Sequence, residues 1–455
     1  MRFGWLAALA LFLLMAARAD ANAAVAARPF GLETRPVSRA FLNLPERADG
    51  ALPRLLSETG AFQSAVDLKP VDGLIPYDLV LSFWSDGASK LRWMSLPGGA
   101  SGTNPKIRFS RTGEWKFPAG TVFVKHFELP VDETRPELKR RLETRLLVCD
   151  AAGGVYGVTY KWHPDNRDAE LLTSNLFEPI EIKTATGTRT QVWYYPSRQD
   201  CLTCHTPLAG GVLGVKTRQL NREFLYPGGV TDNELRAWNH AGLFAPELSE
   251  PDLAACPSLA READPSRGFD DRARSFLDVN CGQCHRPGGT VAAFDARYDT
   301  PLDQQNLING PVLIDQGVDH AKLVAPNDIW RSILYMRANT VEGMKMPPLA
   351  HQTVDTKSMA LLRQWIESLP GPPVLSPVLV SPSGGDFPHP VEVTLRHPEP
   401  GVTIHYTLDG SVPTPSDPVY EHPLKVTDPT TIRAKAYKPG FTKSITVQET
   451  FIIGG

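Results

Sequence analysis

The sequence predicts a multidomain protein with three folded parts: an N-terminal antiparallel β-rich domain, a mostly α-helical middle domain and a C-terminal immunoglobulin-like β-sandwich. Three patterns support this prediction. Apolar and polar residues alternate in short runs up to residue 196, apolar residues recur at helical spacing within 264–370, and alternation returns after a proline-rich stretch. With 42% hydrophobic and 21% charged residues, the 455-residue chain has an ordinary globular composition and the length of about three domains.

The N-terminus has the layout of a secretory signal peptide, predicted over residues 1–23. Arg2 precedes an apolar run over 3–15, and a small-residue segment with cleavage options follows at 16–23. The apolar run is short for a membrane span, although an uncleaved anchor is the alternative. We therefore expect a periplasmic or secreted protein without a transmembrane segment after cleavage. The net charge of −3 gives no sign of a nucleic-acid partner.

Residues 28–196 form the predicted β-rich domain. Alternating runs separated by Gly, Pro and Asp clusters predict strands over residues 106–109, 121–129, 142–148, 154–162 and 191–195. An antiparallel sandwich or a barrel-like sheet is the natural interpretation. The domain contains no enzyme motif that we recognise.

Two copies of one pentapeptide pattern follow this domain: Cys201-Leu-Thr-Cys204-His205 and Cys281-Gly-Gln-Cys284-His285. C-x-x-C-H is the attachment signature of c-type haem. Both thiols add to the porphyrin vinyl groups, and the adjacent histidine becomes an iron ligand. Zinc binding or a redox dithiol is the alternative for either motif. Two copies in an exported chain predict two covalently attached c-type haems, bound through Cys201, Cys204, Cys281 and Cys284, with His205 and His285 as iron ligands.

The region around the motifs divides into a first haem segment, 197–263, and a domain at 264–370 with the second haem. A helix is predicted over 272–280, running into the second motif, and apolar residues at helical spacing predict another over 357–369. A single-haem cytochrome c domain has the order of a helix, the haem motif, loops, a methionine and a terminal helix. Residues 264–370 follow this order, so we expect a cytochrome c-like fold there.

A second axial ligand for the second iron is predicted at Met346. It precedes two prolines in a Gly/Pro-rich loop, and proline restricts the backbone that holds the sulfur. Met344 is the local alternative, and Met336 is interpreted as a core residue.

The first iron has no such methionine, because none lies between His205 and Cys281. The remaining candidates for its second ligand are His240, His126, His163 and Met94. An open coordination position is a further alternative, and it would allow a small substrate to bind.

Six cysteines are present, and Cys149 and Cys256 lie outside the motifs. In an oxidising compartment they either form a disulfide or remain as two separately buried thiols.

Residues 371–382 form a predicted proline-rich linker, and 383–455 the predicted immunoglobulin-like sandwich. The runs Tyr406-Thr-Leu-Asp-Gly-Ser-Val-Pro-Thr414 and Ile432-Arg-Ala-Lys-Ala-Tyr437 resemble the C-terminal module of chitobiases and β-hexosaminidases. That resemblance implies a non-catalytic module, either in contact with carbohydrate or the cell wall or serving as a spacer.

Residues 50–370 resemble an uncharacterised family of exported bacterial dihaem c-type cytochromes. The similar segments include 57–62, 73–77, 83–90, 115–121, 142–145, 213–214, 219–221 and both haem motifs. The resemblance implies two covalent haems and export but no settled reaction. The appended sandwich departs from the family's minimal form.

Two functions are compatible with these observations. The first is electron transfer between periplasmic or extracellular redox partners, which needs the fewest assumptions. The second is a dihaem oxidoreductase of the peroxidase type, with one open or weakly ligated iron. A surface-binding module that carries haem is a weaker third alternative. Whether the protein is an enzyme stays open from sequence.

Overall fold

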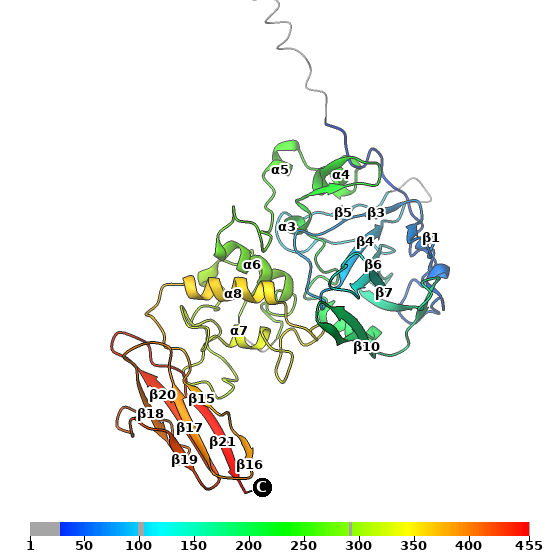
Figure 1. The fold of residues 1–455 in the computed structure, drawn as a ribbon. Helices are drawn as coiled ribbons and strands as arrows, with labels where there is room; N and C mark the ends of the chain where they lie inside the picture. The colour runs from blue at the N-terminus through cyan, green and yellow to red at the C-terminus, as the bar shows by residue number, and fades with distance from the viewer. Residues whose placement is uncertain (1–27, 99–103, 291–293, 455) are drawn as a thin grey trace, which may run out of the picture.

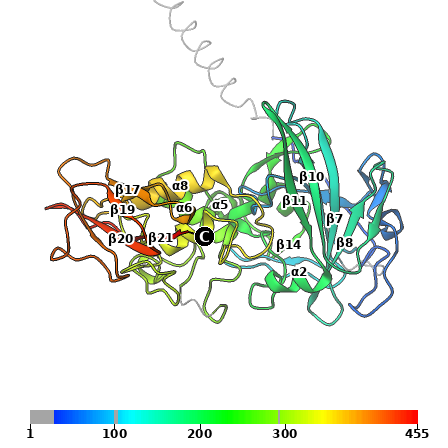
Figure 2. The same cartoon turned by 60° about the horizontal axis from the view of Figure 1, so that its bottom comes forward.

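The structure, a computed structural model, describes residues 28–98, 104–290 and 294–454. The predicted signal peptide at 1–23 lies outside these residues. A β-rich lobe (28–263), a small middle lobe of loops and a few helices (264–370, the helical lobe) and a C-terminal β lobe (371–454) lie in a row (Figures 1 and 2). Within the described ranges, no helix is long and apolar enough to cross a membrane.

A six-stranded antiparallel sheet forms the centre of the β-rich lobe. Its strands, in spatial order, are β3 (Leu74–Pro76), β4 (Ser89–Ser95), β6 (Val122–Pro130), β7 (Lys139–Cys149), β8 (Val155–Trp162) and β9 (Ala169–Leu171). On one face Trp93, Val124 and Leu146 pack into an apolar core. Side chains alternate along a strand, so the residues next to them face the other side, where the first cysteine motif lies.

Smaller strand pairs surround this sheet. They are β1 (Phe62–Ser64) with β2 (Lys69–Pro70), β10 (Leu176–Thr184) with β11 (Gly187–Tyr195), β12 (Glu223–Leu225) with β13 (Thr231–Asn233), and β5 (Ile107–Arg108) parallel to β14 (Phe244–Ala245). The β10–β11 hairpin packs Ile180, Ile182 and Trp193 against Phe127 and Leu129 of β6. The predicted strands near residues 107, 122–129, 142–148, 155–162 and 191–195 are confirmed.

The helices are short. They are α2 (Arg198–Cys204), α3 (Thr217–Leu220), α4 (Glu234–His240), α5 (Glu250–Ala254), α6 (Phe269–Asn280), α7 (Ile333–Ala338) and α8 (Thr356–Ser368), with 3-10 turns η2 (Leu56–Thr59) and η3 (Leu302–Gln304). The predicted helices before the second motif and over 357–369 are confirmed as α6 and α8. These two helices pack together through Leu277, Leu362 and Trp365 in one core.

The prediction of a mostly α-helical, cytochrome c-like middle domain is wrong. Strands make up 30% of the structure and helices 15%, and the seven described helices do not form an all-α haem domain. Between α6 and α8 the chain is largely loop. Asn306, Asn309, Gln316, His320 and Asn327 adopt positive φ there, and such residues interrupt a right-handed helix. Apolar residues recur at helical spacing only at the two ends of 264–370, and the middle of this segment lacks that spacing.

The predicted C-terminal β-sandwich is confirmed. One sheet has the order β16 (Gly385–Phe387), β21 (Val447–Ile453), β20 (Thr430–Tyr437) and β18 (Thr403–Thr407); the other has β15 (Leu379–Ser381), β17 (Val391–Arg396) and β19 (Leu424–Val426). Leu375 and Val378, from the predicted linker, belong to the sandwich core. Lys435 Nζ lies 2.6 Å from Asp319 Oδ2, so an ion pair joins the sandwich to the helical lobe.

Candidate functional site

The first cysteine motif is held at the end of the β-rich lobe by a well-capped helix. Ser197 and Asp200 form a reciprocal capping box at the start of α2, a common way to satisfy free backbone amides. The helix packs on β8 at Gly157, where an added Cβ would lie 2.7 Å from Cys201 Sγ. A glycine in that strand therefore makes room for the Cys201 thiol.

His205 follows the helix and is oriented by one hydrogen bond. Its Nδ1 lies 2.7 Å from the carbonyl oxygen of Gly211, a residue with φ of +74°. This bond fixes Nδ1 as the protonated nitrogen and leaves Nε2 with its lone pair, as in metal-ligating histidines. Burial lowers the pKa of His205 to about 4, so the ring is neutral at physiological pH.

The second motif begins where α6 ends. The His285 backbone N–H donates to the Cys281 carbonyl at 2.8 Å, which keeps the motif in a tight turn. The His285 ring stacks on Phe294 with 4.2 Å between centroids, and its Nδ1 lies 3.2 Å from Thr290 Oγ1. Burial, with the charge of Arg337 as a second cause, lowers the pKa of His285 to about 4.

The two motifs lie close together. The Cys204 and Cys284 thiols interact, which lowers the pKa of Cys284 and, together with burial, raises the pKa of Cys204. Two ion pairs hold the same interface: Lys216 Nζ lies 2.8 Å from Asp278 Oδ2, and Arg286 Nη2 lies 3.0 Å from Glu114 Oε1. The fold thus brings together motifs that are about 80 residues apart in the sequence.

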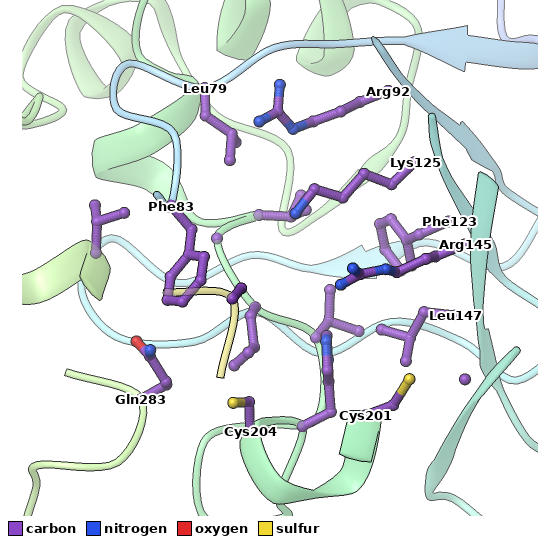
Figure 3. A pocket seen from close by; sticks show the side chains of 18 of the residues that line it. Leu79, Phe83, Arg92, Phe123, Lys125, Arg145, Leu147, Cys201, Cys204 and Gln283 are labelled. Atoms are coloured by element: carbon purple, nitrogen blue, oxygen red, sulfur yellow. The ribbon is translucent and has the colours of Figure 1, made fainter. Parts of the chain in front are cut away.

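A cavity opens beside the first motif, with about 1450 Å³ of empty space including its open part. Cys201, Cys204 and His205 line one end, and apolar residues such as Phe83, Phe123 and Leu147 line the walls (Figure 3). The apolar walls beside the two thiols suit a cofactor attached through both sulfurs.

Three cationic side chains enter this cavity from neighbouring strands: Arg92 of β4, Lys125 of β6 and Arg145 of β7 (Figure 3). Sequence reasoning missed them, because β4, β6 and β7 also contain other charged residues, such as Lys90, Glu128 and Arg140. Burial, reinforced by Arg92, Lys90 and Arg145, lowers the pKa of Lys125 well below its usual value. The accessible surface that Lys125 retains faces the cavity.

The Met346 loop lies beside the second motif. The Met346 backbone N–H donates to Arg337 O at 2.8 Å, and Arg337 Nε donates to Met344 O at 2.6 Å. Arg337 is also the cation that acts on His285. Arg337 therefore holds the loop of half-buried Met346 and also acts on His285.

Residues 83–90 connect this loop to the second motif. Asp86 Oδ1 accepts the backbone N–H groups of Gln352 and Thr353 at 2.7 and 2.8 Å. The Trp84 backbone N–H donates to Asn280 Oδ1 at 2.9 Å, directly before Cys281. The segment 83–90, more than 190 residues before the second motif in the sequence, thus holds both the residue before Cys281 and the chain after Met346.

The candidate ligands for the first iron lie outside the cavity lining. His240 is exposed and stacks on Phe30 at 3.4 Å. His126 is buried on the other face of the sheet, with Nδ1 2.8 Å from Thr144 Oγ1. Met94 is fully buried in a core, and His163 lies 3.7 Å from Glu170. Their placement does not bring any of them to His205.

Cys149 and Cys256 are both buried and free, in the same apolar core. Of the two alternatives predicted for them, the structure has the separate thiols. Among the described residues, no group of three or more His, Cys, Asp or Glu side chains is arranged around a common metal position.

Comparison with protein families identifies one part of the chain. Residues 382–449 match the chitobiase/beta-hexosaminidase C-terminal domain, which confirms the resemblance predicted for this module. No curated protein matches the chain.

Proposed function

We propose that this protein is an exported c-type cytochrome that binds one haem at Cys201, Cys204 and His205, binds a second at Cys281, Cys284 and His285, and transfers electrons between periplasmic or extracellular redox partner proteins. Covalently bound haem supplies a reversible one-electron couple at its iron.

The contact between Cys204 and Cys284 is the observation that carries the proposal. Thioether bonds at these two sulfurs would place both cofactors at one shared interface. The Lys216–Asp278 and Arg286–Glu114 pairs hold that interface. A relay of electrons within one chain needs two centres close together, and this arrangement supplies them.

The residues around each motif also fit attachment of haem. Gly157 leaves room for the Cys201 thiol, and Gly211 keeps the Nε2 lone pair of His205 free. On the second site, Arg337 and Asp86 hold the ends of the loop that carries Met346. We propose Met346 as the second iron ligand there, because a methionine thioether is a common ligand of c-type haem and raises its potential.

Covalent haem content tests the proposal most directly. The full chain is produced in the periplasm of a host with c-type haem maturation, and haem per chain is counted by pyridine haemochrome absorbance and intact mass. We expect two haems in the natural chain, one in Cys201→Ala/Cys204→Ala, one in Cys281→Ala/Cys284→Ala and none in the fourfold variant. Cys149→Ala/Cys256→Ala is the matched control and keeps two. A natural chain without covalent haem would disprove the function.

A second candidate, a dihaem oxidoreductase of the peroxidase type, is favoured by one observation. Among the described residues lining the first cavity, His205 is the only histidine and no methionine is present. Electron paramagnetic resonance of the loaded protein separates the candidates. Two low-spin irons indicate an electron carrier, whereas a high-spin fraction near one half indicates a site open to a substrate.

The sandwich suggests a further partner, a carbohydrate or cell-wall surface. The ion pair of Lys435 with Asp319 is supporting evidence that it moves together with the helical lobe. Sedimentation of the loaded full chain with purified peptidoglycan, against a chain ending at residue 370, tests this partner. Equal sedimentation of both chains would assign the module a spacer role.

A further inference from the structure

The row of cations in the first cavity has a direct register across the sheet. Arg92 is paired with Lys125 and Lys125 with Arg145, so three cationic residues lie opposite one another on one face. Like charges directly opposite in a sheet are destabilising. The row is also enclosed, where bulk water screens charge poorly. Such an arrangement is expected where an anion belongs.

The outer members of the row already have protein partners. Arg92 Nη1 is paired with Asp78, and Arg145 Nη2 with Glu143. Among the described residues, the Lys125 ammonium forms no hydrogen bond or ion pair with a side chain, and its Nζ lies 5.0 Å from the centroid of the Phe127 ring. A buried charge of this kind is costly unless it is paired.

We propose that Lys125, together with Arg92, binds the propionate carboxylates of the haem attached at Cys201 and Cys204. This inference rests on the proposed function and extends it to the orientation of the first haem. In a porphyrin the two propionates lie on the edge opposite the vinyl groups. Attachment at the two thiols therefore directs the carboxylates to the other end of the cavity.

The order of the strands places the cations along this direction. Cys201 lies against Gly157 of β8, and β7, β6 and β4 follow in that order across the sheet. Neighbouring strands lie roughly 4.8 Å apart, so the backbone of Arg145 is about 5 Å from β8, that of Lys125 about 10 Å and that of Arg92 about 14 Å. Figure 3 shows the same sequence, with Arg92 farthest from Cys201 and Cys204. Arg145 lies near the thiols, whereas Lys125 and Arg92 lie at the propionate end.

The test is the midpoint potential of the first haem in Lys125→Gln. The full, doubly loaded chain is titrated, and the step of the first haem is identified by its loss in Cys201→Ala/Cys204→Ala. A cation beside the porphyrin favours the reduced iron, which carries one positive charge less. Removing Lys125 is therefore expected to shift the reduction equilibrium about tenfold towards the oxidised form, which is about 59 mV for one electron.

Two variants serve as controls. Lys139→Gln removes an exposed cation from the far end of β7 and is expected to leave the potential unchanged. Lys125→Arg keeps the charge and is expected to retain most of the natural potential. The covalent haem count is measured on every variant. Failure of the proposed function would appear as a natural chain without haem, which is distinct from failure of the Lys125 inference.

Two outcomes would overturn the inference. An unchanged potential in Lys125→Gln means that the carboxylates are bound elsewhere. Conversion of the first haem from low to high spin means that Lys125 is an iron ligand. If Lys125→Gln fails to load haem, the substitution is measured in the fourfold cysteine variant. Removal of the buried and unpaired Lys125 amine is expected to raise the thermal midpoint there, and a lowered midpoint would contradict the argument that Lys125 lacks a partner.

Discussion

The thiols of Cys204 and Cys284 lie close enough to shift each other's pKa. Each is the second cysteine of its C-x-x-C-H motif, so the motifs meet at equivalent positions. The contact lies between the β-rich lobe and the helical lobe, and the ion pairs around it join the two. Any cofactor attached at these sulfurs would therefore depend on the same interface that joins the lobes.

Gly157→Ala is expected to disturb the first motif. The new Cβ would lie 2.7 Å from Cys201 Sγ and 2.8 Å from Cys201 Cβ, so α2 must shift. Overpacking of this kind costs about 1–3 kcal/mol. We expect that loss in free energy of unfolding, together with reduced haem attachment at Cys201 and Cys204. Gly228→Ala, where a Cβ meets nothing within 4 Å, is the control, and equal effects from both variants would contradict the packing argument.

Arg286→Gln is expected to loosen the contact between the two motifs. The Arg286 side chain is 7% exposed and also donates to the Leu208 carbonyl at 3.2 Å. Breaking a buried pair leaves Glu114 without its partner and costs about 3–5 kcal/mol, measured by urea unfolding. The exposed pair of Arg363 with Glu367 gives the comparison, since Arg363→Gln should cost less than about 1 kcal/mol. Similar losses in both would exclude a special role for Arg286.

Glu234→Gln is expected to change the pH dependence of stability. Glu234 is fully buried, and burial raises its pKa well above the usual value. The native state thus holds this proton more tightly than the unfolded chain does. Its contribution to stability is present below about pH 4.5 and is lost as pH rises through the folded-state pKa. Glu234→Gln should remove that loss, so unfolding free energies measured at pH 5 and pH 8 should differ less than in the natural chain.

The exposed residue Glu250 provides the matched control for this prediction. Glu250→Gln should leave the difference between the two pH values as it is. A Glu234→Gln variant with an unchanged pH dependence would show that the Glu234 carboxyl stays ionised in the fold.

Asp86→Ala is expected to release the chain after Met346. Three hydrogen bonds end on Asp86 Oδ1, from the backbone N–H groups of Gln352 and Thr353 and the Thr353 hydroxyl. Their loss leaves buried donors unsatisfied, at a cost of about 1–3 kcal/mol. Hydrogen exchange should become faster over residues 345–353 and stay unchanged in the sandwich. Asp409→Ala, in an exposed turn, serves as the control, and unaltered exchange near Met346 would contradict the role of Asp86.

Local patterns in the sequence determined a large part of this protein. Alternation predicted β6, β7 and β8, and helical spacing predicted α6 and α8, because each pattern depends on residues close together in the chain. The two C-x-x-C-H motifs and the chitobiase-like module were likewise readable without a structure. The helical middle domain was predicted wrongly, because periodicity at the ends of 264–370 was extended across a loop region that has none.

Only the tertiary structure decided how these parts meet. The contact of Cys204 with Cys284, the register of Arg92, Lys125 and Arg145, and the bonds from Asp86 to residue 353 join positions separated by 20 to more than 260 residues. Such contacts depend on strand register and on lobe packing, which a single sequence leaves undetermined. The sequence by itself therefore specified the chemistry of the thiols and histidines, and the fold decided which of them share a site and which charges surround it.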